Sequence, residues 1–278
     1  MNVGNRLPAS EILYWDLAVH PMTALAPTLR RHPRFSSAFL TRERDIVVYL
    51  PPGYDTSETR CPVLYLHDGQ NLFEPGRAHV PGQHWRVGET VDELIAGGTL
   101  PPIIVVGIDN TGHSRIQEYT PTSDARLGGG LAGRYGRFLV EELKPFIDRT
   151  YRTRSDPDGT SLGGSSLGGL ATLHIGLTQP GVFGALVAMS PSVWWDRRVI
   201  LSTVRRTRPR PAVRIWVDMG TAEGRRALDD ARMLKAALVG AGWSVGRDLH
   251  YAEYEGGTHS ETAWAERLAA VLTWLYRR

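Results

Sequence analysis

The stretch Gly159-Thr-Ser-Leu-Gly-Gly-Ser-Ser-Leu-Gly-Gly-Leu170 decides how the rest of the chain is interpreted. It contains the pattern G-x-S-x-G twice, centred on Ser161 and on Ser166, so the pattern alone does not identify a nucleophile. A nucleophile elbow needs a strand before the serine and a helix directly after it, because the sharp turn exposes the hydroxyl at the helix N-terminus. Apolar residues at helical spacing follow only the second serine, over residues 167–177. The sequence therefore favours Ser166.

The glycines around Ser166 have separate expected roles. Gly164 and Gly168 flank a residue held in strained backbone angles and must leave no Cβ atom in its way. Gly169 allows the following helix to approach the strand closely.

The rest of the chain predicts an α/β fold in a single domain spanning residues 1–278, with an N-terminal segment, residues 1–34, that carries no clear assignment. Two strands at 36–40 and 45–50, joined by the charged residues 41–44, suggest a hairpin. Strands and helices then alternate to the end of the chain. This alternation is typical of a mostly parallel sheet with helices on both faces, and the hairpin gives that sheet an antiparallel N-terminal edge. The expected strands are 63–68, 103–108, 185–190, 213–218 and 248–254, and the expected helices are 90–96, 131–149, 228–239 and 261–276.

Composition excludes several classes of protein. The chain has 278 residues and a formal net charge of +3, and no stretch is long and apolar enough to cross a membrane. The basic run at 205–210 lacks interleaved aromatic residues, so we expect no nucleic-acid partner. The N-terminus shows no apolar segment after a basic start, which predicts a cytoplasmic protein.

Polar residues follow the predicted strands, where α/β sheets bind their ligands. A serine nucleophile needs a base, and the base needs an acid that orients it; on such sheets the order along the chain is serine, acid, histidine. His259, in the glycine-rich loop before the last helix, is the best base by position. Two acids follow the preceding strand, Asp218 and Glu223. We favour Glu223 because its longer side chain, farther along the loop, could reach His259.

Two backbone N–H groups directed at one point would complete such a site. Leu167, directly after the serine, supplies one. The turn after the strand that ends at His67 supplies the other, through Gln70 or Gly69. No metal site is expected, because His67 and Asp68 lack paired ligand spacing with His79, His84 or His113. No cofactor is expected either.

Seven segments, in order, resemble the putative-esterase family of α/β-hydrolases, which includes enterochelin esterases, feruloyl esterases, S-formylglutathione hydrolases (esterase D-like proteins) and mycolyltransferases. They are Val47-Val-Tyr-Leu-Pro-Pro-Gly-Tyr54, Val63-Leu-Tyr-Leu-His-Asp-Gly-Gln70, Glu118-Tyr-Thr-Pro121, Gly164-Ser-Ser-Leu-Gly-Gly169, Ser190-Pro-Ser-Val-Trp-Trp195, Gly220-Thr-Ala-Glu223 and Gly256-Gly-Thr-His-Ser260. The chain is most similar to the enterochelin-esterase-like members. The resemblance implies an α/β-hydrolase fold, Ser166, Glu223 and His259 as a catalytic triad, and the N–H groups of Gln70 and Leu167 as the oxyanion hole.

The expected activity is therefore hydrolysis of carboxylic esters through an acyl-enzyme on Ser166, with a small-molecule ester as partner, either a siderophore or an aryl ester. An acyltransferase with the same site, or a non-catalytic binding protein on the same fold, are the alternatives. Five residues are expected to shape the substrate pocket: Arg115, Glu118, Tyr119, Trp194 and Trp195.

Overall fold

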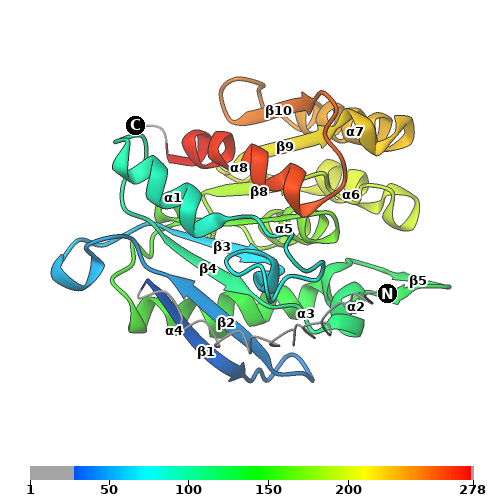
Figure 1. Cartoon of the computed structure of the whole chain (residues 1–278). Helices are drawn as coiled ribbons and strands as arrows, with labels where there is room; N and C mark the ends of the chain where they lie inside the picture. Colours follow the sequence, from blue (N-terminus) through cyan, green and yellow to red (C-terminus); the bar gives the residue numbers. More distant parts are fainter. Residues whose placement is uncertain (1–27, 277–278) are drawn as a thin grey trace, which may run out of the picture.

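A computed structural model describes residues 28–276 and contains one eight-stranded sheet in the order β1-β2-β4-β3-β7-β8-β9-β10 (Figure 1). The strands are β1 (Leu29–Phe35), β2 (Arg44–Tyr49), β3 (Val63–His67), β4 (Ile104–Ile108), β7 (Thr160–Ser165), β8 (Ala185–Met189), β9 (Arg214–Gly220) and β10 (Leu249–Tyr254). Neighbours pair in parallel except at β2, which is antiparallel to both β1 and β4. The predicted α/β fold with an antiparallel N-terminal edge is confirmed.

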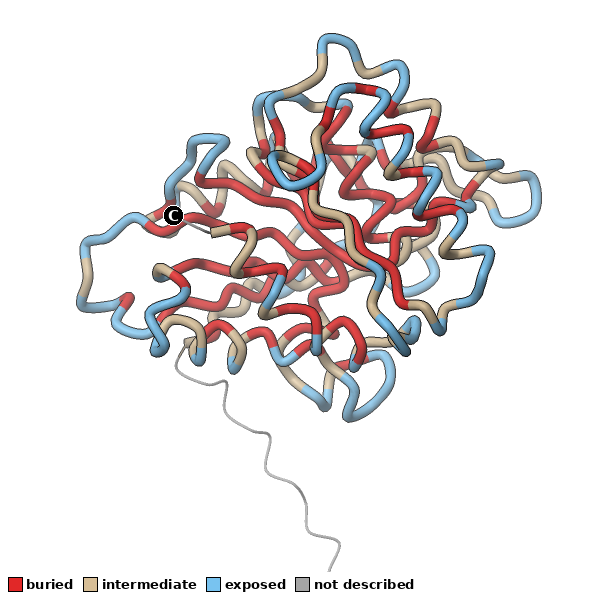
Figure 2. The backbone as a smooth tube through the Cα atoms, turned by 90° about the horizontal axis from the view of Figure 1, so that it is seen from above, coloured by how far each residue is buried: buried red, intermediate tan, exposed pale blue. Residues whose placement is uncertain are grey.

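Continuous apolar runs form the middle of this sheet. Every residue of β3, β4 and β8 is buried, as expected for strands that are covered on both faces. Buried backbone occupies the centre of the molecule, and the exposed segments lie at its periphery (Figure 2).

Helices cover both faces. The helices are α1 (Val87–Ala96), α2 (Arg115–Tyr119), α3 (Ala132–Arg137), α4 (Lys144–Thr150), α5 (Leu167–Thr178), α6 (Trp195–Arg206), α7 (Arg225–Gly240) and α8 (Glu261–Tyr276). The apolar residues of α1 and α8 join one core, and those of α3 to α7 join the core on the opposite face. A small separate hairpin, β5 (Ser123–Asp124) and β6 (Gly128–Gly129), follows α2.

The helix predicted at 131–149 is present but interrupted. A π-helical segment, Phe138–Leu143, separates α3 from α4. Pro145 follows it in the first turn of α4, and it has no N–H to donate to the carbonyl of Glu141. A wider helical turn before the proline removes the need for that bond.

The prediction of the first hairpin strand, at residues 36–40, is wrong. Residues 36–40 lie in the connection, and the strand paired with β2 is β1, at Leu29–Phe35. The sequence was misleading because Pro33 argues against a strand. An edge strand tolerates a proline, and the pairing register shifts between His32 and Phe35, where Arg34 has a positive φ of 54°.

Part of the N-terminal segment lies outside the described residues, which begin at residue 28. No helix between residues 28 and 276 has the length and hydropathy needed to cross a bilayer.

Candidate active site

The turn between β7 and α5 consists of one residue, Ser166. Its φ is 57° and its ψ is −122°, a strained conformation for a residue with a side chain. Its N–H is held by a 3.0 Å hydrogen bond to the carbonyl oxygen of Met189 in β8. Ser161 lies inside β7 and is buried. The strand-to-helix turn therefore contains Ser166 and excludes Ser161.

Two glycines permit this turn. A Cβ atom on Gly164 would lie 2.9 Å from Cδ2 of His67, and one on Gly169 would lie 3.2 Å from Pro191. Both distances are shorter than a van der Waals contact of about 3.5 Å between carbon atoms. A side chain at position 164 would collide with His67, and one at position 169 would push α5 away from the loop that follows β8.

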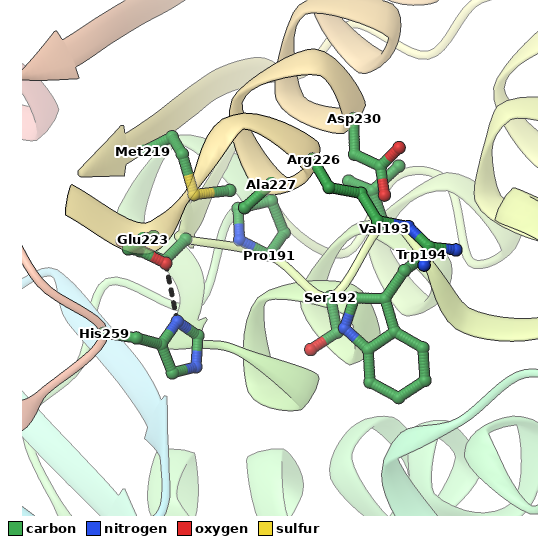
Figure 3. Close-up of a pocket in the computed structure, with 11 residues that line it drawn as sticks. Pro191, Ser192, Val193, Trp194, Met219, Glu223, Arg226, Ala227, Asp230 and His259 are labelled. Atoms are coloured by element: carbon green, nitrogen blue, oxygen red, sulfur yellow. Dashed lines mark hydrogen bonds and ion pairs between the residues drawn. The ribbon is translucent and has the colours of Figure 1, made fainter. Parts of the chain in front are cut away.

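Hydrogen bonds connect Ser166, His259 and Glu223 at the carboxyl edge of the sheet. Ser166 Oγ lies 2.9 Å from His259 Nε2, and His259 Nδ1 lies 2.6 Å from Glu223 Oε2. His259 comes from the loop between β10 and α8, and Glu223 ends a short 3-10 turn after β9. Figure 3 shows the bond between the ring and the carboxylate.

The loops that carry Glu223 and His259 meet because β9 and β10 are parallel neighbours. The Ala222 N–H donates to the carbonyl of Gly257 at 3.0 Å, and the Gly256 N–H donates to Thr221 Oγ1 at 2.9 Å. Only glycine fits at position 220, where a Cβ atom would lie 2.1 Å from that same carbonyl oxygen. These hydrogen bonds therefore fix the loop that carries Glu223 relative to the loop that carries His259.

The second oxygen of Glu223 is also bound. Its Oε1 accepts from Ser190 Oγ at 2.5 Å and from the Gly220 N–H at 2.9 Å. Burial alone would raise the pKa of Glu223, but the hydrogen bonds from His259, Ser190 and Gly220 lower it below its usual value. The carboxylate is thus ionised and fixed, and it accepts a hydrogen bond from Nδ1 of His259.

Asp218, the alternative acid, makes different contacts. It is fully buried, 2.7 Å from Arg267 Nη1, and it accepts from Trp216 Nε1 at 2.7 Å. Neither of its oxygens bonds to His259. The structure therefore brings Glu223, and not Asp218, to the histidine.

Ser190 links these two carboxylates. Its N–H donates to the Asp218 backbone carbonyl at 3.0 Å and to the Asp218 carboxylate Oδ1 at 3.3 Å. Its hydroxyl accepts from Trp264 Nε1 at 3.1 Å and Arg267 Nη1 at 3.3 Å while donating to Glu223. Ser190 has a φ of 43°, so this bonding holds another strained residue. A buried polar network thus fixes the position of the Glu223 carboxylate.

The expected oxyanion donors border the serine. Gln70 lies in the 3-10 turn Gly69–Asn71 after β3, and Leu167 is the first residue of α5. Within residues 28–276, neither N–H donates to a protein acceptor. A Cβ atom on Gly69 would lie 2.7 Å from the backbone of Gly107 in β4, so glycine lets this turn pack against the sheet.

Arg115 fixes the same turn from outside. Its Nε and Nη2 bind the two oxygens of Asp68 at 2.8 and 2.7 Å, and Asn110 Nδ2 binds Asp68 Oδ1 at 2.7 Å. Asp68, with φ at 58°, precedes the 3-10 turn. Burial alone would raise the pKa of Asp68, but the guanidinium of Arg115 and the Asn110 amide hold it below its usual value.

Two cavities flank His259. The larger, about 580 Å³, is polar and is bordered by Ser166, Gln70, Arg115 and Glu261. The smaller, about 380 Å³, lies on the Glu223 side and includes Trp194. Such volumes are typical of small-molecule sites, which occupy about 300–1,000 Å³.

Three of the five expected pocket residues line neither of these cavities. Glu118 is buried in a two-bond ion pair with Arg44 at 2.9 and 2.8 Å, Tyr119 is fully buried, and Trp195 is fully buried with Nε1 donating to the carbonyl of Thr122 at 3.1 Å. These side chains support the loops that form the cavities. Arg115 and Trp194 do border the cavities.

Sequence reasoning missed Ser190 and Arg267 as supports of the acid. One signal for Arg267 was present: it falls on the buried face of α8 between Trp264 and Val271, where helical spacing predicts an apolar residue. For Ser190 only its place at a strand end was visible. Among the described residues, no group of three or more histidine, cysteine or acidic side chains is arranged to hold a metal ion.

Comparison with known proteins gives the family. Residues 37–275 match the family model described as "Putative esterase". The chain belongs to this family of carboxylic ester hydrolases. Among curated relatives, the esterase is 30% identical over 190 residues to the uncharacterized protein YjcH of Bacillus subtilis, covering 68% of this chain and 72% of that protein.

A relative with a named activity also matches. The esterase is 29% identical to the iron(III) enterobactin esterase of Dickeya dadantii over 276 residues, which cover 93% of this chain but 58% of that enzyme. The crystal structure of an IroE-like serine hydrolase from Shewanella oneidensis shares the fold, with a TM-score of 0.74 at 23% identity over 90% of this chain and 80% of that one.

The buried pair of Asp218 and Arg267 predicts a stability effect. Asp218→Asn leaves the Arg267 guanidinium buried without its charged partner, so we expect a loss of about 3 kcal/mol in unfolding free energy, measured by urea denaturation. Asp229→Asn is the matched control, because Asp229 is half exposed and 3.7 Å from Arg232, and such surface pairs contribute less than about 1 kcal/mol. Equal stability of the two variants would contradict a structural role for Asp218.

Arg115 predicts a pH-dependent stability effect. In the wild type the lowered pKa of Asp68 stabilises the fold above the ordinary carboxyl range, and this contribution is lost as pH falls below about 4. In Arg115→Gln, burial without the guanidinium raises that pKa, so the variant melts well below the wild type near pH 7. The difference should shrink as the pH is lowered to about 4.5, because protonated Asp68 no longer needs a cation.

Thermal melts at the two pH values check this expectation. Arg137→Gln, which breaks an exposed ion pair with Glu141, should show a small difference at both. A difference for Arg115→Gln that did not change with pH would mean that Arg115 acts through packing and not through the charge on Asp68.

Proposed function

We propose that this esterase hydrolyses its substrate through an acyl-enzyme on Ser166, with His259 as general base and Glu223 as the acid that orients it. One observation carries the proposal: the hydrogen bonds from Ser166 to His259 and from His259 to Glu223, at 2.9 and 2.6 Å, at a strand-to-helix turn bordered by two free backbone N–H groups. A serine hydroxyl is a weak nucleophile, and this arrangement supplies the base, the orientation of the base and a place for negative charge.

In the first half of the reaction, Ser166 Oγ attacks the ester carbonyl carbon while its proton passes to His259 Nε2. Negative charge develops on the carbonyl oxygen, where the N–H groups of Gln70 and Leu167 would donate to it. Glu223 stabilises the imidazolium through Nδ1 without taking its proton. The bond to the alcohol oxygen then breaks, and His259 returns the proton to the departing alcohol.

In the second half, water replaces the alcohol. His259 takes a proton from the water molecule while the water oxygen attacks the acyl carbon. The same N–H groups would donate to the negative oxygen of the second tetrahedral intermediate. Its collapse releases the acid and returns the proton to Ser166 Oγ. The loop carrying Glu223 and the loop carrying His259 are bonded to each other, which keeps the base in position through both halves.

For the substrate we propose an aryl ester or a siderophore ester. The exposed ring of Trp194 on the smaller cavity supports an aromatic group. The similarity to an iron(III) enterobactin esterase supports the siderophore, although the chain spans 58% of that enzyme's length. Purified protein assayed on p-nitrophenyl esters of increasing chain length, on aryl esters and on a ferric trilactone siderophore would identify the preferred class.

Ser166→Ala should abolish ester hydrolysis, with a loss in kcat of at least about a thousandfold, because the nucleophile is removed. Ser161→Ala is the matched control and should retain most activity, since Ser161 is buried in β7. Labelling by a serine-directed phosphonate, located by mass spectrometry, gives an independent readout. A label on Ser161 in the wild type would contradict the assignment.

Glu223→Gln should lower kcat at least about a hundredfold with little change in melting temperature, because the histidine loses the carboxylate that fixes its tautomer. Asp218→Asn should show the opposite pattern, a less stable protein that retains turnover when folded. Steady-state kinetics with thermal melts separate the two roles. If Asp218→Asn were inactive and stable while Glu223→Gln behaved as wild type, Asp218 would be the acid.

A further inference from the structure

The smaller cavity lies between the loop that follows β8 and the first turns of α7. His259 and Glu223 border one side, and Trp194 and Arg226 border the other (Figure 3). A group that enters this cavity therefore lies directly beside the hydrogen bond from His259 to Glu223. Ser192, which also lines the cavity, has its Oγ 3.4 Å from Ser166 Oγ, so the cavity lies next to that serine.

Most of the lining is apolar. Pro191, Val193, Met219 and Ala227 contribute to it, and Trp194 adds a large flat ring. Trp194 is 48% exposed and is the one aromatic side chain among the exposed large apolar residues of the described chain. A solvent-facing indole in the cavity that His259 also lines offers a surface on which an aromatic ring can stack.

Arg226 is the cation of this cavity, and the protein provides it with no anion. Within residues 28–276 it forms neither an ion pair nor a side-chain hydrogen bond, and Figure 3 shows it extending from α7 toward Trp194. It lies in the first turn of α7, where the helix dipole disfavours a positive charge. Helix stability therefore does not account for an arginine here.

Asp230 would be the natural partner of Arg226, because residues four apart on a helix are neighbours. However, Asp230 is buried and binds Arg198 Nε at 2.5 Å. Both oxygens of Glu223, the other carboxylate in the lining, are bound to His259, Ser190 and Gly220. Each carboxylate that lines the cavity therefore already has its partners, and neither of them pairs with Arg226.

The backbone is strained where it delivers Arg198 to Asp230. Asp196, Arg197 and Arg198 have φ values of 39°, 52° and 65°, three consecutive left-handed residues at the start of α6. Each such residue costs about 1 kcal/mol or more in a chain of L-amino acids. Strain of this kind persists where the surroundings enforce it and often borders functional sites. Here it directs Arg198 to Asp230, in the wall of the cavity.

We propose that this cavity binds an aryl group with an anionic substituent, such as a carboxylate or phenolate, with the ring on Trp194 and the anion on Arg226. The proposal rests on the proposed esterase function, because the aryl group belongs to the ester cleaved at Ser166. A guanidinium is suited to this role, since its planar donors bind carboxylates and phenolates more strongly than they bind neutral acceptors.

Two pairs of matched esters test it. In the first pair, para-acetoxybenzoate and para-acetoxybenzamide, the charge is on the departing phenol. In the second, monophenyl terephthalate and phenyl para-carbamoylbenzoate, the charge is on the acyl part. The wild type should prefer the anion in at least one pair, and the pair that shows the preference identifies which half of the ester enters the cavity.

Arg226→Gln should lower the ratio of kcat/KM for the anionic ester to that for its neutral match about tenfold, as expected for loss of one charge-assisted hydrogen bond. Arg225→Gln is the matched control, because Arg225 is exposed in the same helical turn but lies outside the cavity. It should leave the ratio within about twofold, since screening weakens distant surface charges. Trp194→Ala should raise KM for both aryl esters relative to ethyl butyrate.

No preference for the anion in either pair, or an equal loss for both esters in Arg226→Gln, would overturn the proposal. Binding measured without turnover separates it from the proposed function. Calorimetric titration of Ser166→Ala with the preferred anionic ester should give a Kd that rises about tenfold when Arg226→Gln is added. If the ester bound but the wild type did not hydrolyse it, the proposed function would be wrong and the cavity assignment would stand. If the wild type hydrolysed both esters of each pair equally well, the cavity assignment would be wrong and the proposed function would stand.

Discussion

The hydrogen bond between Ser166 and His259 joins residues 93 positions apart, and the fold must meet one constraint to form it. The strands β7, β8, β9 and β10 lie side by side and run in the same direction, so their carboxyl ends reach the same edge of the sheet. Each strand end then contributes one part: Ser166, Ser190, the loop of Glu223 and the loop of His259. If β10 paired in the opposite direction, its end would place His259 at the far edge.

Parallel strands bring these loops together, but the buried polar network fixes their positions. Arg267 lies in α8, on one face of the sheet, and reaches Asp218 at the end of β9 and Ser190 at the end of β8. Burying this ion pair would be unfavourable if either partner lacked bonds. Here the carboxylate of Asp218 also accepts a hydrogen bond from Trp216. The hydroxyl of Ser190 donates to Glu223, so the position of Glu223 depends on the same network. The helix that covers the sheet therefore also orients Glu223.

Much of this could be predicted from sequence, because it depends on local patterns. Buried apolar runs identified β3, β4 and β8, and the apolar residues that follow Ser166 at helical spacing identified the turn before α5. What could not be predicted depends on partners distant in sequence. Glu118 pairs with Arg44, 74 positions away, which removes it from any pocket. The strand β1 was missed because tolerance of Pro33 depends on its place at the edge of the sheet.

The two adjacent tryptophans also show that burial cannot be predicted from local sequence alone. Trp194 is 48% exposed and Trp195 is fully buried, although nothing in their sequence distinguishes them. The left-handed residues that follow, Asp196 to Arg198, determine the direction of the chain there. Of the eight non-glycine residues with positive φ in the described chain, three line the two cavities, namely Asp68, Ser166 and Ser190, and three follow the tryptophans directly, namely Asp196, Arg197 and Arg198. Of these, Asp68, Ser190 and Arg198 are each held by an ion pair or by several hydrogen bonds. Because these anchors oppose local strain, a substitution that removes one of them should displace the site before it unfolds the sheet.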